Sequence, residues 1–447
     1  MTNKVLFKKS PFLKVLEGKD KSILYHSLNG NPTLVGNDLI LFLKNIDKPF
    51  TLFDFKKLKN DQISTIADLL DLNFLIENDK DERELFIKKL SDESKNRSLF
   101  SDGLVLTLTT KCNYACTYCI AERNIGDIGV LDCEIAIETI DNYIKTCKSI
   151  NPSFTSFNLV LTGGEALLNW HDIENIIKHN KKIHNNITIK YRIITNGSLV
   201  TKNIAKQLKD ISCDVIISVD GEKKIHDLNR KFKNGKGTWH STWKGLSLLS
   251  KEDCSISISA VYNQNSNMAF SDKLLKRLSE MKISNITINI DNLSLLKEET
   301  KVVGKKLIDL RCRAKKFNIE VGGMWTIPIK NMWDNKRDIS LCSASSRGGI
   351  YVTPDKQIRF CEYHNKILGS IDNMGKVWDE HTNKENPYLF GKWHECTNCQ
   401  LEGFCSPCVL EKESLGEQFN AFQKKKCTLF KYCTNEIIKE KLGTYSV

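Results

Sequence analysis

Three closely spaced cysteines carry the clearest chemistry in the sequence. Cys112, Cys116 and Cys119 follow the apolar run at residues 104–108, on what reads as a short loop after a strand. Such thiolates can bind one face of a metal centre, and a four-iron cluster with only three cysteine ligands keeps one iron open for chemistry. A structural zinc site is the alternative, but it usually needs a fourth Cys or His nearby, and the next cysteine, Cys133, falls in a predicted helix.

The segment from Lys111 to Cys119 resembles the CxxxCxΦC signature of the radical S-adenosylmethionine (SAM) superfamily, with Tyr118 at the aromatic position. The resemblance implies that the open iron chelates SAM through its amino and carboxylate groups. It also implies that the reduced cluster cleaves SAM to a 5′-deoxyadenosyl radical.

Further candidate SAM contacts follow the next predicted strands. Gly163 and Gly164 let the backbone approach a ligand, and a backbone carbonyl or Glu165 can accept hydrogen bonds from an ammonium. These three residues resemble the GGE motif that holds the SAM amino group. Asn196 and Ser218 resemble superfamily positions on the SAM side of the barrel, with Ser218 a candidate for the ribose hydroxyls; the alternative for both is an ordinary polar turn.

A loop at residues 226–239 resembles the HDxxR…GxGT(F/W) pattern of the peptide-modifying branch of the superfamily. Within it, Arg230 could form a bidentate pair with the SAM carboxylate, a geometry that suits a guanidinium. Asn263, after the fifth predicted strand, is a second candidate for the same site.

Alternating strands and helices must position these residues. Apolar, β-branched runs predict strands at residues 103–109, 157–161, 190–195, 213–219, 254–261 and 284–290, and helical periodicity fills the gaps at about 131–149, 171–183, 201–209, 239–250 and 270–282. Strands separated by helices imply a parallel sheet whose ligands collect at the carboxyl ends of the strands. The predicted fold is α/β, a partial (β/α)6 barrel.

The last hundred residues are rich in cysteine, and spacing alone does not decide between zinc and iron–sulfur there. The pattern resembles the SPASM domain, which holds two auxiliary [4Fe–4S] clusters, so the resemblance implies three clusters in all. Carried over, the ligands are Cys342, Cys361 and Cys408 for the first auxiliary cluster, and Cys396, Cys399, Cys405 and Cys427 for the second, with Cys433 as the alternative to Cys427.

This sequence departs from the SPASM pattern at two places. Lys356 stands where the pattern has Gly, and two residues instead of three separate Cys405 from Cys408. The first auxiliary cluster then has three evident cysteines, and its fourth ligand stays open. Glu362 occupies the place where some relatives carry an acidic base, and a carboxylate there could take a substrate proton; a solvent-facing glutamate is the alternative.

The chain divides into five predicted parts: residues 1–90, a linker at 91–102, the barrel at 103–300, a connecting, twitch-like region at 301–341, and the SPASM domain at 342–447. Residues 1–90 read as strands around a turn at Asn29–Asn31, two helices and a returning strand. This winged-helix order is similar to PqqD-like domains, which bind the leader of a precursor peptide at a sheet edge. A DNA-binding winged helix is the rival, but 17 basic against 15 acidic residues in the first 100 disfavour DNA.

Composition limits the remaining possibilities. The 447 residues include no long apolar run for a membrane span and no apolar signal segment at the start. Sixteen cysteines without such a signal indicate thiolates kept reduced for metals, so we expect a cytoplasmic protein. The net charge of +12 is compatible with an acidic peptide or nucleic acid, and equally with a solvated lysine-rich surface.

These observations predict a radical SAM/SPASM maturase that modifies a ribosomally made (RiPP) precursor peptide. The N-terminal domain would bind the leader, and the barrel would abstract a hydrogen from a core residue. The expected product is a two-electron oxidation: a thioether, a carbon–carbon crosslink or an unsaturation. Flavodoxin or ferredoxin is the expected electron donor, and nucleic acid is not an expected partner.

Two other functions stay open. An enzyme like the anaerobic sulfatase maturases would oxidise Ser or Cys to formylglycine, which leaves the N-terminal domain without a role. An iron–sulfur or zinc regulator would bind nucleic acid through the winged helix. The iron content after anaerobic reconstitution distinguishes this regulator from the maturase, because three clusters hold about twelve irons per chain.

Overall fold

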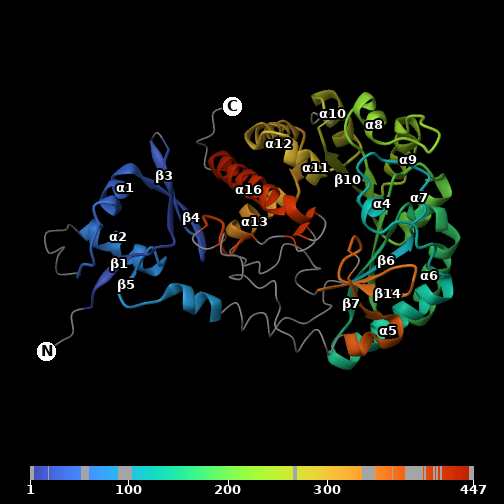
Figure 1. The fold of residues 1–447 in the computed structure, drawn as a ribbon, viewed down its shortest axis with the longest axis horizontal. Helices are drawn as coiled ribbons and strands as arrows, with labels where there is room; N and C mark the ends of the chain where they lie inside the picture. Colours follow the sequence, from blue (N-terminus) through green and yellow to red (C-terminus); the bar gives the residue numbers. More distant parts are fainter. Residues whose placement is uncertain are drawn as a thin grey trace.

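The computed structural model describes residues 5–18, 20–51, 60–88, 103–264, 269–334, 348–364, 366–377, 396, 399–405, 408, 411–412 and 415–441. In these residues an N-terminal unit lies at one end of the molecule and a large sheet with its helices at the other (Figure 1). The C-terminal helix α16 (Phe419–Lys441) lies between them. No helix in the described segments is both long and apolar enough to cross a membrane.

The N-terminal unit has its own apolar core. The strands are β1 (Phe7–Lys9), β2 (Leu13–Leu16), β3 (Lys21–His26), β4 (Gly30–Gly36) and β5 (Leu75–Glu77), and the helices are α1 (Asn37–Lys44) and α2 (Asn60–Asp71). Strands β2, β3 and β4 form an antiparallel sheet, and β1 pairs with β5. Gly30 and Asn31 both have positive φ, as the tight turn predicted there requires.

Ten strands form one sheet in the described part of the chain, in the order β12-β11-β10-β9-β8-β7-β6-β13-β14-β15. Neighbouring strands from β12 through β6 to β13 are parallel, and β14 and β15 continue antiparallel. The strands are β6 (Gly103–Thr109), β7 (Ser156–Gly163), β8 (Thr188–Thr195), β9 (Asp214–Ser218), β10 (Ser255–Tyr262), β11 (Asn285–Ile290), β12 (Glu320–Gly322), β13 (Gly349–Val352), β14 (Gln357–Arg359) and β15 (Ile367–Ser370). This parallel central sheet confirms the predicted α/β class.

Helices follow most strands and cover the apolar face of the sheet. They are α4 (Ile120–Asn124), α5 (Cys133–Ile150), α6 (Trp170–Ile183), α7 (Lys202–Asp210), α8 (Lys223–Asn229), α9 (Trp239–Lys251), α10 (Asp272–Glu280), α11 (Asn292–Lys297), α12 (Thr300–Lys315) and α13 (Ile327–Trp333), with 3₁₀ turns η2 (Ala166–Asn169), η3 (Met324–Thr326), η4 (Ile371–Asn373) and η6 (Gly416–Gln418). Four of these α-helices begin with a side chain that accepts a hydrogen bond from the first turn. Asp132 caps α5, Thr201 caps α7, Ser271 caps α10 and Asp291 caps α11.

Alternation along the strands gives the sheet two different faces. On β10, Ile256, Ile258 and Ala260 are buried beneath the helices, while Ser257 and Ser259 face the other side and are half-buried. The apolar face joins one continuous core that reaches from the sheet to α16. The opposite face is therefore available to a ligand at the carboxyl ends of the strands.

The sheet extends beyond the six strands that local patterns predict. Strand β12 pairs with β11, and β13 pairs with β6 although Gly349 and Gly103 lie far apart in the sequence. Strands β13 and β14 pair antiparallel as a hairpin. Its turn includes Lys356 with φ +61°, a conformation that favours glycine.

Candidate functional site

The three cysteines of the 112–119 segment lie on the loop between β6 and α4, and neighbouring segments hold that loop from two sides. The backbone N–H groups of Ala115 and Thr117 donate to the carbonyls of Lys231 and Asn229, at 2.7 and 3.0 Å. Cys119 directly precedes α4. The loop is therefore built against the end of α8, which brings the motif at residues 226–239 to the cysteines.

Burial raises the pKa of the Cys116 thiol to about 12 and also raises the pKa of Cys112. Both thiols are protonated at neutral pH unless a metal displaces the proton. No three described cysteines have sulfur atoms that all lie within 4.8 Å of one another. Ligands of one tetrahedral zinc ion with bonds near 2.3 Å would lie about 3.8 Å apart, and the three cysteines of this loop are not grouped that closely.

The GGE segment packs directly on the cysteine loop. A Cβ at Gly163 would lie 2.3 Å from the Thr109 carbonyl oxygen, and one at Gly164 would lie 2.4 Å from that of Lys111. The N–H groups of Gly164 and Glu165 donate to the same two carbonyls, at 2.7 and 3.0 Å. Glycine is thus required at both positions by close backbone approach.

The Glu165 carboxylate is buried and already accepts three hydrogen bonds within the protein. Its donors are Leu167 N–H at 3.0 Å, the Thr195 hydroxyl at 2.6 Å and Asn196 N–H at 2.7 Å. Burial raises its pKa, although the three hydrogen bonds oppose the shift. The side chain thereby joins the end of β7 to the end of β8.

Asn196 connects the end of β8 to the cysteine loop. Its side-chain amide donates to the Asn113 Oδ1 at 2.8 Å, and Asn113 donates in turn to the Ser198 hydroxyl at 2.9 Å. Ser218 is half-buried at the end of β9, in register with Ser259 on β10. One edge of the sheet therefore holds four of the predicted sites: Cys112–Cys119, Gly163–Glu165, Asn196 and Ser218.

A buried ion pair lies beside Tyr118. Arg230 donates to the Asp220 Oδ1 at 3.1 Å, Val261 N–H donates to the same oxygen at 3.0 Å, and the Tyr118 hydroxyl donates to Oδ2. Burial alone would lower the pKa of Arg230, but the Asp220 charge outweighs it and the pKa is raised. The guanidinium is held charged over the Tyr118 ring, 5.4 Å from its centroid.

Two buried donors at this site have no hydrogen-bond acceptor among the described residues: the Nε of Arg230 and the Nδ2 of Asn229. An unpaired buried donor costs about 1–3 kcal/mol, more when it is charged. The Asn229 Oδ1 accepts from Asn263 at 3.0 Å, which fixes the amide orientation. Both free donors therefore suit an anionic acceptor such as a carboxylate.

His226 supports this ion pair from behind. Its Nδ1 accepts from Asp220 N–H at 3.4 Å, so Nε2 carries the proton and donates to the Thr238 hydroxyl at 3.1 Å. Thr238 donates onward to the Arg230 carbonyl at 2.8 Å. Burial, and then the Arg230 charge, lower the pKa of His226 to about 4. The imidazole is neutral and positions Arg230.

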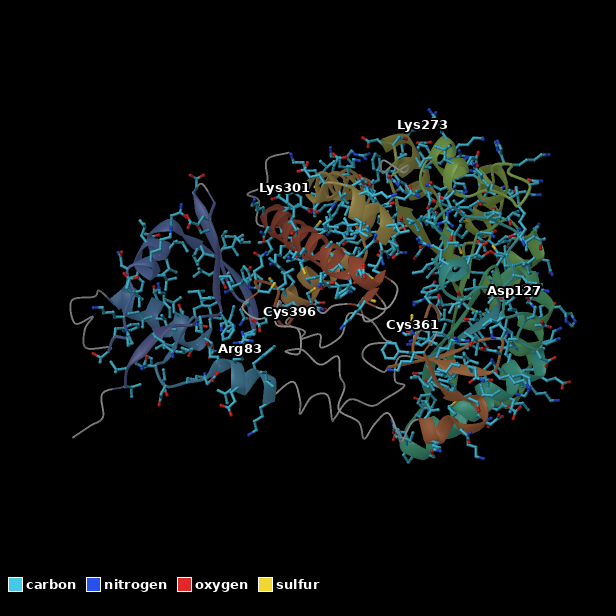
Figure 2. The ribbon with its side chains drawn as sticks, viewed as in Figure 1. Arg83, Asp127, Lys273, Lys301, Cys361 and Cys396 are labelled. Carbon is cyan, nitrogen blue, oxygen red and sulfur yellow. The ribbon has the colours of Figure 1, made fainter. Side chains whose placement is uncertain are left out.

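Glu362 lies next to Cys361 after β14 and accepts a hydrogen bond from the neighbouring Tyr363 hydroxyl. Burial raises the pKa of Glu362. The Glu362 charge, followed by burial, raises the pKa of Tyr363, and Cys119 lies close enough to contribute. The C-terminal segment thus brings a carboxyl–phenol pair near the cysteine loop that follows β6. Figure 2 shows Cys361 at the side of the large sheet that is nearer to α16.

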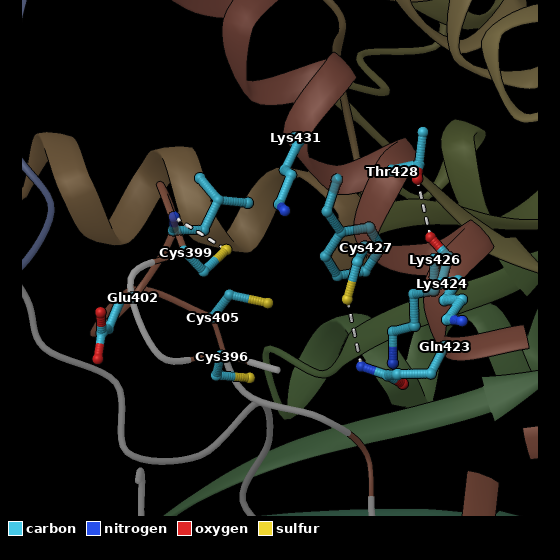
Figure 3. Close-up of a pocket in the computed structure, with 12 residues that line it drawn as sticks. Cys396, Cys399, Glu402, Cys405, Gln423, Lys424, Lys426, Cys427, Thr428 and Lys431 are labelled. Carbon is cyan, nitrogen blue, oxygen red and sulfur yellow. Dashed lines mark hydrogen bonds between the residues drawn. The ribbon is translucent and has the colours of Figure 1, made fainter. Parts of the chain in front are cut away.

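Four C-terminal cysteines line one cavity of about 370 Å³: Cys396, Cys399, Cys405 and Cys427. Figure 3 shows their sulfur atoms around the same space, with Lys424, Lys426 and Lys431 nearby. Cys433 is fully buried in the apolar core and does not line this cavity. Cys342 lies outside the described residues, and Cys408 lies within electrostatic reach of Lys426.

The N-terminal unit contacts this cysteine loop directly. Arg83 makes two hydrogen bonds to the Glu402 carboxylate, at 2.6 and 3.1 Å, and the Glu402 N–H donates to the Cys399 carbonyl. Figure 2 shows Arg83 on the side of the N-terminal unit that faces Cys396. On the same side of the unit, burial and then the Cys399 charge raise the pKa of Tyr25.

Sequence reasoning missed Asp220, Asn229 and Tyr363. Asp220 and Asn229 could have been found, because each is a polar neighbour of a residue already selected, Ser218 or Arg230. Tyr363 carried no such signal, since only the pairing of β13 with β6 brings it to the cysteine loop.

Comparisons with known proteins agree with this geometry. Residues 106–268 match the model of the Radical SAM superfamily. The chain is 26% identical to the radical SAM cyclopropyl synthase TigE of Paramaledivibacter caminithermalis, over 98% of this chain and 96% of that protein. It is 24% identical to a cysteine-type anaerobic sulfatase-maturating enzyme of Clostridium perfringens, over 75% and 96% respectively.

A solved structure of anSMEcpe with bound AdoMet has the same fold, with a TM-score of 0.61 at 21% identity over 75% of this chain and 98% of that chain. The superfamily implies a [4Fe–4S] cluster and SAM. The three cysteines and the two buried donors described above fit both groups.

Proposed function

We propose that this chain, whose residues 106–268 match the radical SAM superfamily model, is a radical SAM enzyme that oxidises a peptide by two electrons and closes a new carbon–carbon bond in it. The similarity to TigE, which is named a cyclopropyl synthase and aligns over nearly the whole chain, supports ring formation in preference to a thioether. Forming one carbon–carbon bond from two C–H bonds removes two electrons and two protons. One hydrogen leaves as an atom, and a base and an electron acceptor take the rest.

The observation that carries the proposal is the pair of buried donors on Arg230 and Asn229 beside the cysteine loop. When bound, the cluster and SAM supply a 5′-deoxyadenosyl radical, which removes a hydrogen atom from the substrate. In the proposal Cys112, Cys116 and Cys119 hold the cluster, and the two donors bind the SAM carboxylate. Donors that are already fixed in place before the ligand arrives reduce the cost of orienting it.

The other SAM contacts proposed here follow from position. The carbonyls at Gly163 and Gly164 would accept from the SAM ammonium, and Ser218 would bind the ribose hydroxyls. Four further side chains contribute mainly by positioning, because each forms a hydrogen bond with a neighbour within the site: Tyr118, Glu165, Asn196 and Asn263.

Two auxiliary [4Fe–4S] clusters form part of the proposal and would bring the total to three. The cavity lined by Cys396, Cys399, Cys405 and Cys427 supports one of them, and the complete burial of Cys433 supports Cys427 as its ligand. Lysines around the cavity offset the negative charge of a thiolate-ligated cluster. Cys342, Cys361 and Cys408 are proposed for the other, which would accept the second electron from the substrate radical.

Glu362 is the proposed base. Its raised pKa favours proton uptake, and Tyr363 is placed to hold its carboxylate in one orientation. The pair lies toward Cys119, where the substrate hydrogen would be removed. A carboxylate in this position can accept the second proton as the new bond forms.

We further propose that the N-terminal unit binds the leader of the precursor peptide, as PqqD-like domains do. Its direct contact with the Cys399–Glu402 loop supports a role in catalysis, since it connects leader binding to the auxiliary site. Flavodoxin or ferredoxin would supply electrons in a reducing cytoplasm.

Oxidation of Ser or Cys to formylglycine is the second candidate, favoured by the similarity to the sulfatase-maturating enzyme. Mass spectrometry of the precursor peptide after anaerobic turnover distinguishes ring closure from formylglycine formation. Ring closure removes two hydrogens and leaves no carbonyl, whereas formylglycine reacts with a hydrazide probe. A hydrazide adduct would refute ring formation. A peptide with deuterium at the reacting carbon should transfer it to 5′-deoxyadenosine in either case.

A further inference from the structure

The strongest cluster of metal-binding side chains outside the cysteine sites lies on the outer helical layer. Asp141 on α5 meets two histidines at the end of α6, His179 and His184. The Nε2 atoms of both histidines approach the same carboxylate oxygen, Asp141 Oδ1, at 3.1 and 2.7 Å. All three ligand atoms lie within 4.8 Å of one another, and they form the only group of this kind among the described residues.

We propose that Asp141, His179 and His184 bind a divalent transition-metal ion such as Zn²⁺. Zinc bonds to nitrogen and carboxylate oxygen are about 2.0–2.2 Å long, so tetrahedral ligands lie roughly 3.3–3.5 Å apart. The observed separations are shorter by a few tenths of an ångström to about 0.8 Å, so small side-chain rotations admit the ion. Two histidines and one carboxylate on one face leave the remaining positions for water.

The surroundings allow the ion to enter from solvent. The side chains of His179, His184 and Asp141 are 25%, 13% and 39% exposed, so none must unfold to bind. His184 ends α6, where the helix dipole favours a cation. Lys181 and Lys182 in the same turn oppose a cation, but both are exposed and screened by water.

Hydrogen bonding alone is the competing explanation. Two neutral histidines can each donate from Nε2 to one carboxylate oxygen without any metal. That arrangement predicts that Zn²⁺ binds no better to this chain than to a variant lacking the triad. An ion would instead crosslink α5 to the end of α6, far from the radical chemistry, and its role would be structural.

Untagged, cluster-loaded enzyme should be dialysed anaerobically against micromolar Zn²⁺ and the bound zinc counted by mass spectrometry. The wild type should bind one more zinc per chain than Asp141→Asn/His184→Gln. His179→Gln alone should lower the zinc affinity of this site by at least about 10–100-fold, the loss that removal of a group hydrogen-bonded to a metal ligand usually causes. His171→Gln is the matched control, because His171 is an exposed histidine on the same helix.

Zinc K-edge absorption identifies the ligands. The proposal predicts nitrogen and oxygen neighbours near 2.0 Å with imidazole scattering, whereas zinc captured by cysteines shows sulfur near 2.3 Å. Equal zinc binding by the wild type and the double variant, or sulfur neighbours alone, would overturn the proposal.

Discussion

Replacing Arg230 with Met should weaken SAM binding by a predictable amount. The guanidinium is buried against Asp220, and its Nε is one of the two donors without an acceptor in the described residues. A hydrogen bond to a charged group contributes about 1.5–3 kcal/mol. Its loss should therefore raise the dissociation constant of SAM roughly 10- to 150-fold.

The same substitution also leaves the Asp220 carboxylate buried without its partner, which costs about 3–5 kcal/mol of stability. Arg230→Met/Asp220→Asn removes that unpaired charge. The double variant should recover most of the lost thermal stability but none of the lost SAM affinity. This difference separates ligand binding from a purely structural role.

Equilibrium dialysis of cluster-loaded enzyme with labelled SAM measures the affinity, and thermal unfolding under argon measures the stability. The exposed pair Arg192–Asp214 on the sheet is a matched control, for which Arg192→Met should change neither quantity by more than about 1 kcal/mol. If the double variant bound SAM within twofold of the wild type, Arg230 would not contact the cofactor.

Three other substitutions test the roles of Glu165, Glu362 and Lys356. Glu165→Gln keeps the shape of the side chain but places an NH₂ group against backbone and hydroxyl donors. The thermal midpoint should therefore fall and SAM cleavage should drop at least tenfold. Unchanged cleavage would show that Glu165 is not needed to join the ends of β7 and β8. Glu362→Gln should abolish product while 5′-deoxyadenosine still forms, and normal product would exclude it as the base. Lys356→Gly removes the backbone strain of a side chain at positive φ and should stabilise the protein by about 0.5–1 kcal/mol, seen as a higher thermal midpoint. A lower midpoint would show that Lys356 is not strained.

Local patterns predicted the sheet well because each element carries its own signals. The predicted strand at residues 103–109 is β6 without change, and the helix predicted at about 131–149 is α5, displaced by the cap at Asp132. Helix caps, apolar periodicity and β-branched runs all act within one turn or one strand, so the local sequence is enough to identify them.

Contacts between distant segments were not predictable in this way. Nothing near Gly349 indicates that β13 pairs with β6, and this pairing brings Tyr363 toward Cys119. The bonds from Asp220 to Tyr118 and Arg230 likewise depend on how three loops meet above the sheet. The candidate residues were found from motifs, while their partners required the fold.

In the proposed function, one iron of the cluster held by Cys112, Cys116 and Cys119 has no protein ligand and takes SAM instead. Electron–nuclear double resonance of the reduced enzyme with SAM labelled in its carboxylate and amino groups tests it most directly. Both labels should show hyperfine coupling, and 5′-deoxyadenosine should be released on reduction. Absence of both couplings, with a fourth protein ligand on that iron, would contradict it.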